Sequence, residues 1–178
     1  MTEAPISAGL VPCVGCGGLV PDEDGPMHRY MTASPGCWRT YTEVAATGWP
    51  PSPKAALGVD AYAVTHPGVR GPQSTPSVWI HLVALCLLLE RGWSLEQAVT
   101  IRRVAADAFD GWPWLEPAAS TGNATVIDVA RAIEAEGRGS SAAVATVERW
   151  VGAAWNAWSG DHAAVRSRAD DLVARFFA

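Results

Sequence analysis

The chain has 178 residues, of which 49% are hydrophobic and 17% are charged, so it can bury a core and is not a disordered polypeptide. Its net charge of −5 and pI of about 5.3 argue against a nucleic-acid-binding protein, which needs a basic face. The start, MTEAPISAGL, lacks the pattern of a signal peptide, and the most apolar run, residues 78–89, is too short to cross a bilayer. We therefore expect a single cytoplasmic domain that does not enter a membrane.

The N-terminal residues 1–37 are rich in glycine, proline and cysteine, and they contain the ligands of a metal site. Cys13 and Cys16 form a C-x-x-C pair, and Cys37 follows in the sequence SPGCW. Thiolates and imidazole are the usual ligands of tetrahedral zinc, and cysteines in a reducing compartment favour metal over disulfides. We predict a zinc-knuckle-like loop that binds Zn²⁺ through these cysteines and His28. A water, an aspartate or a more distant histidine is the alternative to His28, and a redox or free-thiol pair is the alternative to zinc.

Few elements are predicted between this loop and residue 76. Residues 38–47 form a short helix that ends at Gly48, before the Pro50-Pro51 pair. Residues 60–66 are an ordered segment of undetermined type, and Pro67 ends it. The remaining stretches are loops rich in proline and glycine.

The second half of the chain is predicted to be helical. Residues 77–91 are apolar on nearly every side, which is typical of a buried central helix, and Gly92 ends them. The later predicted helices begin at the caps Ser94 (with Gln97 in a capping box, running to about Phe109), Thr125 (to Glu136), Ser141 (to Trp158) and Asp161. Strand patterns are almost absent. We predict an all-α fold, a single domain in which residues 38–178 form the helical body.

Three further histidines are candidates for chemistry. His81 lies inside an apolar helix, where an imidazole without a partner costs about 1–3 kcal/mol. His66 precedes Pro67 and is presented from a rigid turn, where Asp60 could orient it. His162 lies at the start of the last helix. Together these histidines could form an open metal site, or act in acid/base catalysis; the alternatives are a satisfied core residue for His81, a loop residue for His66 and a solvated residue for His162.

The late tryptophans have two interpretations, and the fourth cysteine has one. Trp150, Trp155 and Trp158 cluster late in the chain, either as the aromatic wall of a small-molecule pocket or as core between helices. Cys86 lies on the apolar helix and is most simply a small core residue. The sequence contains no phosphate-binding glycine loop, HExxH helix or Gly-x-Ser-x-Gly motif.

Five segments in order along the chain resemble an uncharacterised bacterial family, a domain of unknown function. They are CVGCG at 13–17, HRYMTASPGCW at 28–38, DAYAVTHPG at 60–68, IHLVALCLLLERG at 80–92 and WNAWSGDH at 155–162. The resemblance supports these motifs, and it implies no particular reaction.

Two functional hypotheses follow. In the first, the chain is a small zinc metalloenzyme, and His66, His81 and His162, with Asp60 as the orienting carboxylate, act on a small molecule. In the second, it is a non-catalytic binding or regulatory module in which the zinc is purely structural. An adaptor that binds other proteins through the knuckle has no support in the sequence.

Overall fold

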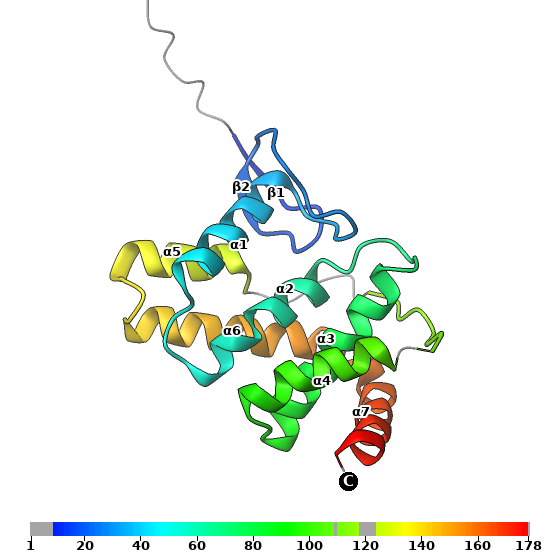
Figure 1. Ribbon diagram of the computed structural model, residues 1–178. Helices are drawn as coiled ribbons and strands as arrows, with labels where there is room; N and C mark the ends of the chain where they lie inside the picture. The colour runs from blue at the N-terminus through cyan, green and yellow to red at the C-terminus, as the bar shows by residue number, and fades with distance from the viewer. Residues whose placement is uncertain (1–8, 109, 118–123, 178) are drawn as a thin grey trace, which may run out of the picture.

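The computed structural model describes residues 9–108, 110–117 and 124–177, and α-helices dominate this part of the chain (Figure 1). The helices are α1 (Pro35–Thr47), α2 (Gly58–Thr65), α3 (Ser74–Arg91), α4 (Leu95–Asp107), α5 (Val126–Glu136), α6 (Ser141–Asn156) and α7 (His162–Phe176), with short 3₁₀ segments η1 (Pro53–Leu57) and η2 (Ser159–Asp161). The predicted all-α class is confirmed.

A small antiparallel hairpin precedes the helices, where the sequence predicted only loop. Strand β1 (Leu10–Pro12) pairs with β2 (Leu19–Pro21), and Val11 lies opposite Val20. Strands of three residues that end in proline are too short to show an alternating pattern, which explains why they escaped prediction. The hairpin lies at one end of the molecule and α7 lies at the opposite end (Figure 1).

Helix α3 is the centre of the helical body. It packs against α2, α4 and α7, and its apolar side chains, including Leu82 and Leu85, are fully buried. Burying one such leucine contributes about 1.5–3 kcal/mol. The helix begins three residues earlier than the predicted start at Ser77 and ends, as predicted, at Gly92, whose φ of 66° is left-handed.

Two of the predicted helix caps form as expected. Ser94 Oγ accepts from the Gln97 amide, and the Gln97 side chain accepts from the Ser94 amide, which completes the capping box. Thr125 begins α5 and forms a similar box with Asp128. The Ser94–Gln97 box succeeds as a prediction because a capping box is a local pattern of residues three apart, whereas for Thr125 the cap was predicted without its partner Asp128.

The other predicted helix ends differ in detail. Ser140, not Ser141, caps α6, because its Oγ accepts from the Ala143 amide. Asp161 occupies the cap position of α7, but its side chain makes no capping hydrogen bond. The predicted end of α4 at Phe109 lies outside the described residues; in them α4 ends at Asp107.

The segment whose type the sequence left undetermined is a helix, α2. It is short and almost wholly buried between α3 and α6. Trp49 covers its first turn so closely that a Cβ on Gly58 would lie 2.6 Å from the indole ring. The last turn of α2 is fixed by Trp158, whose indole N–H donates to the carbonyl of Val64 at 3.2 Å.

The late tryptophans are core residues in the structure. The exposed fractions of Trp150, Trp155 and Trp158 are 1%, 5% and 2%. Their burial favours the packing interpretation over an open aromatic wall. No helix in the described ranges is long and apolar enough to span a bilayer.

Candidate metal centre and histidine pocket

Three cysteines and one histidine bring their ligand atoms together. The Sγ atoms of Cys13, Cys16 and Cys37 and a ring nitrogen of His66 all lie within 4.8 Å of one another. His66 Nε2 lies 3.6 Å from Cys13 Sγ and 3.4 Å from Cys37 Sγ, and the Cys16 and Cys37 sulfurs are 3.9 Å apart. Cys13, Cys37 and His66 are buried and Cys16 is half-buried.

These distances fit a tetrahedral metal ion. With metal–sulfur bonds of about 2.3 Å and metal–nitrogen bonds of about 2.0–2.1 Å, the edges of a tetrahedron are about 3.8 Å between sulfurs and about 3.5 Å between sulfur and nitrogen. The observed separations of 3.9, 3.6 and 3.4 Å match these edges. A Cys₃His group that could hold a metal ion is therefore present.

The hairpin turn presents the first two cysteines. Cys13 follows β1, its amide donates to the Gly18 carbonyl at 2.8 Å, and its own carbonyl accepts from the Gly17 amide at 2.9 Å. Gly15 faces the cluster so closely that a Cβ there would lie 2.1 Å from the Thr32 carbonyl oxygen. A glycine between the two cysteines is thus required by the approach of a second chain segment.

The third cysteine is presented by the first turn of α1, and Ser34 joins that turn to the hairpin. The Ser34 amide donates to Cys13 Sγ at 3.4 Å, and Ser34 Oγ accepts from the Val14 amide at 3.1 Å. The amide contact supplies a donor to a sulfur atom, as is usual around metal thiolates. Cys37 therefore reaches the cluster from a helix end that is itself fixed to the knuckle.

The fourth ligand atom comes from the end of α2. His66 follows the last residue of that helix, and its Nδ1–H donates to the Tyr62 carbonyl at 2.8 Å. Since a carbonyl can only accept, this bond assigns the proton to Nδ1 and leaves the Nε2 lone pair toward the sulfurs. The Tyr62 ring also stacks on the imidazole at 4.0 Å between centroids. His66 is therefore held in the tautomer that a metal ligand needs.

The ligand groups share protons when no cation is bound. Hydrogen bonds from Cys16 and Cys37 hold the pKa of Cys13 far below that of an ordinary thiol, whereas the contacts with Cys13 and Cys16, together with burial, raise the pKa of Cys37. Burial alone would lower the pKa of His66, but hydrogen bonds from Cys13 and Cys16 outweigh it and raise the pKa to about 9. A bound cation replaces such protons, so metal binding here releases them.

The sequence suggested that Asp60 orients His66. In the structure Asp60 instead lies beside His81. Its carboxylate is fully buried and accepts from His81 Nδ1 at 2.8 Å. Arg102 of α4 also binds this carboxylate with two nitrogens, its Nε at 2.8 Å from Oδ1 and its second nitrogen on Oδ2. The structure thus contains an Asp60–His81–Arg102 group that is separate from the cysteines.

The sequence profile of one family matches residues 11–159, a span that contains both groups of residues. It is described as a family of unknown function, DUF5946. The chain belongs to this family. Searches of curated proteins and of solved structures give no match. The resemblance to an uncharacterised family is therefore confirmed, and the chemistry of this DUF5946 chain has to be argued from its own residues.

In this DUF5946 chain the structure places His66, and not His28, with the three cysteines. His28 packs edge-on against Tyr30 and Trp38, at 4.5 and 4.9 Å between ring centroids. Its Nδ1 is buried and has no hydrogen-bond partner in the described residues, and burial lowers the pKa of its ring. His28 was predicted because it lies between the cysteines in the sequence, whereas the packing of α2 brings His66 to the cluster.

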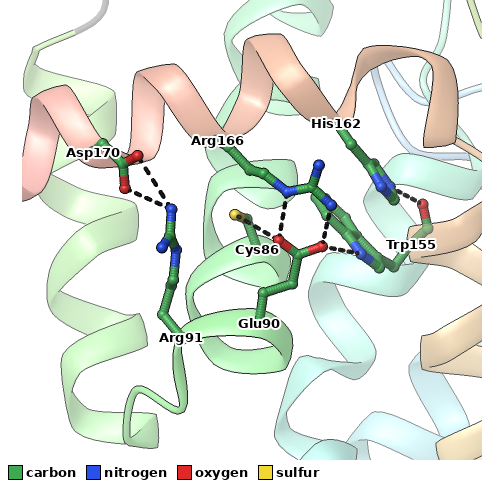
Figure 2. A network of polar contacts seen from close by, with 7 residues as sticks. All are labelled: Cys86, Glu90, Arg91, Trp155, His162, Arg166 and Asp170. Carbon is green, nitrogen blue, oxygen red and sulfur yellow. Dashed lines mark hydrogen bonds and ion pairs between the residues drawn. The ribbon is translucent and has the colours of Figure 1, made fainter.

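His162 lies apart from both groups, in a network that joins three helices. Its ring stacks on Trp155 at 3.8 Å between centroids, and its Nε2–H donates to the Trp155 carbonyl at 3.0 Å. Figure 2 shows the adjoining contacts: Glu90 of α3 accepts from the Trp155 indole at 3.2 Å and from two Arg166 nitrogens at 2.7 Å. The bond of the His162 ring therefore fastens α7 to α6, and the bonds of Glu90 fasten both helices to α3.

The predicted three-histidine metal site is not assembled in the part of the chain that the structure describes. His66 lies in the Cys₃His group, His81 binds Asp60, and His162 stacks on Trp155. Arg102 was missed because its partner Asp60 lies on another helix, 42 residues earlier. Cys86 is buried on α3 and makes no part of the Cys₃His group, in keeping with its predicted place in the core.

Proposed function

We propose that the chain is a zinc-binding metalloprotein in which the ion has a structural role. The observation that carries the proposal is the Cys₃His group, whose ligand atoms all lie within 4.8 Å of one another and three of whose separations match the edges of a zinc tetrahedron. Thiolates favour soft ions such as Zn²⁺ and Cu⁺ or iron–sulfur clusters, and one histidine with three cysteines is a common zinc set. Four protein ligands fill the coordination sphere and leave no position for a substrate.

The role of such an ion is to fasten the N-terminal segment to the helical body. Its ligands come from the hairpin turn, from the first turn of α1 and from the end of α2. Segments of few apolar contacts gain most from such a link, because the ion replaces a core that they cannot build. The proposal places the protein in a reducing compartment, the cytoplasm, where all four cysteines remain reduced.

The proposal is tested by the metal content of matched cysteine variants. Cys16→Ala removes a ligand, and Cys86→Ala removes a thiol of the same chain that lies in the core. We expect the wild type and Cys86→Ala to bind one zinc per chain and Cys16→Ala to lose it to a chromophoric chelator. Equal zinc retention by the two variants would contradict the proposed site.

An enzyme is the second candidate, because His81, whose Nδ1 binds Asp60, borders a pocket between helices. Metal-bound water held by three histidines has lost its support, since the three lie in separate places. Histidine acid/base catalysis on a small molecule keeps its support, and the non-catalytic module with a purely structural zinc is the alternative. An activity that His81→Ala abolishes without loss of zinc would favour the enzyme, whereas a loss of stability alone would favour the module.

A further inference from the structure

A pocket of about 370 Å³ lies beside His81, away from the cysteines. Helix α3 supplies Pro76, Ser77, Ile80 and His81 to its wall, Tyr30 borders it from the segment that leads to α1, and Ala106 borders it from α4. The volume lies within the range of small-molecule sites. It suits a ligand of about the size of a substituted aromatic ring.

His81 presents one ring nitrogen for use in this pocket. Its Nδ1 faces the fully buried Asp60 carboxylate, which can only accept, so Nδ1 carries the proton. Asp60 occupies Nδ1 and is not part of the pocket wall, whereas His81 is, so Nε2 is the ring nitrogen left for a ligand in the pocket. No described residue makes a hydrogen bond to Nε2, and the neutral ring therefore keeps its lone pair there.

Arg102 completes the arrangement by matching the charge of the carboxylate. The guanidinium binds both oxygens of Asp60, so the buried negative charge has a permanent partner besides the imidazole. Asp60 and Arg102 are positioning residues, since they act through His81. An imidazole held by a carboxylate at Nδ1 is the arrangement that histidine bases use to take up a proton at Nε2.

We propose that this pocket is a general-base site for a small, uncharged and largely apolar molecule. His81 Nε2 removes a weakly acidic proton from the ligand: the new N–H bond forms on the imidazole, the bond to that proton breaks, and its electron pair stays on the ligand. Asp60 stabilises the imidazolium that results. The inference goes beyond the zinc proposal, and it holds or fails independently of the identity of the ion.

The residues that line the pocket indicate the class of ligand. No lysine, arginine, aspartate or glutamate is among the described residues that border the pocket, so an ionic ligand would find no opposite charge. Pro72, Pro76 and Ile80 supply apolar surface, while Gln73 and Ser77 can orient a polar group. A neutral molecule with one acidic proton is the best match to this set.

The first test reads the tautomer of His81. In protein labelled with ¹⁵N-histidine, long-range proton–nitrogen spectra of the neutral His81 ring should show a protonated Nδ1 and a bare Nε2. Asp60→Asn should disturb this pattern, whereas a merely structural carboxylate would leave it unchanged. A proton on Nε2 of the neutral ring in the wild type would overturn the proposal, even if no variant of His81 could be purified.

The second test measures proton removal with a probe, a nitrobenzisoxazole. A base takes its ring proton, the electron pair closes a nitrile, the nitrogen–oxygen bond breaks, and a coloured phenolate is released. We expect a saturable rate in the wild type, a loss of about tenfold or more in His81→Gln, and no change in His162→Gln, the matched histidine outside the pocket.

The outcomes separate this inference from the zinc proposal. A His81-dependent rate in protein that retains its zinc supports the base. Equal rates in His81→Gln, His162→Gln and the wild type, or a wild-type rate no greater than that of buffer, overturn it. Zinc content is measured on the same samples, and its absence contradicts the metal centre while leaving the result for His81 to stand by itself.

Discussion

The identity of the fourth ligand, His66 and not His28, provides the sharpest test of the metal centre. His66→Ala removes the only nitrogen of the Cys₃His group and opens one vertex to water. His28→Ala removes a ring that packs on Tyr30 and Trp38 and whose buried Nδ1 has no partner in the described residues. The two variants delete the same atoms, and only the first should weaken zinc binding.

The expected magnitude follows from linkage. Loss of a group that merely supports a ligand costs about 10–100-fold in metal affinity, so loss of a ligand should cost about 100-fold or more. At saturating zinc a 100-fold weaker affinity removes about 3 kcal/mol of zinc-dependent stability. His66→Ala should therefore lose that much of the stability difference between zinc-loaded and chelated protein, and His28→Ala should keep the difference.

The assay is urea unfolding of each variant with excess zinc and with chelator, together with competition for zinc by a chromophoric chelator. The difference between the two unfolding curves isolates the contribution of the ion from any loss of packing around the deleted ring. If His28→Ala loses zinc and His66→Ala retains it, the assignment of the fourth ligand is refuted.

Three further changes test the surroundings of both sites. Gly15→Ala should weaken zinc binding about tenfold or more, because its Cβ would lie 2.1 Å from a carbonyl oxygen and 2.4 Å from the His66 ring; chelator competition measures this. Arg102→Met should cost about 3–5 kcal/mol in urea unfolding, because it leaves Asp60 buried without its cation. Glu90→Gln should reduce stability at neutral pH but not in acid: the Arg166 hydrogen bond lowers the pKa of Glu90, so its contribution is present above the unfolded pKa and disappears as the pH falls through the folded one.

Each of these predictions has a control within the same chain. Gly9→Ala has open space around its Cβ and should leave zinc affinity unchanged. The double variant Asp60→Asn with Arg102→Met should be more stable than Arg102→Met alone, since no charge is then left unpaired. A Glu90→Gln effect that is the same at pH 7 and in acid would show that the side chain acts by packing and not by its charge.

The sequence predicted those features that depend on near neighbours in the chain. The capping box of Ser94 and Gln97 spans three residues, and the cysteines of the C-x-x-C pair share one turn. Such patterns are local, so one stretch of sequence contains all the information that they need. The same holds for Gly92, which ends α3 because its left-handed φ suits glycine.

The features that escaped prediction depend on the packing of distant helices. His66 reaches the cysteines only because α2 lies beside the hairpin turn, 29 residues after Cys37. Asp60 does not serve His66, because it lies in the first turn of α2, where His81 and Arg102 bind its carboxylate, whereas His66 follows the last residue of that helix. Arg102 meets Asp60 from another helix, and no spacing in the sequence announces that contact.

The most direct test of the account is X-ray absorption at the zinc edge, combined with elemental mass spectrometry, on protein purified without added metal or chelator. A Cys₃His centre predicts one zinc per chain with three sulfur neighbours at about 2.3 Å and one nitrogen at about 2.0–2.1 Å. A metal-free protein, or an ion with fewer than three sulfur neighbours, would contradict the Cys₃His centre formed by Cys13, Cys16, Cys37 and His66.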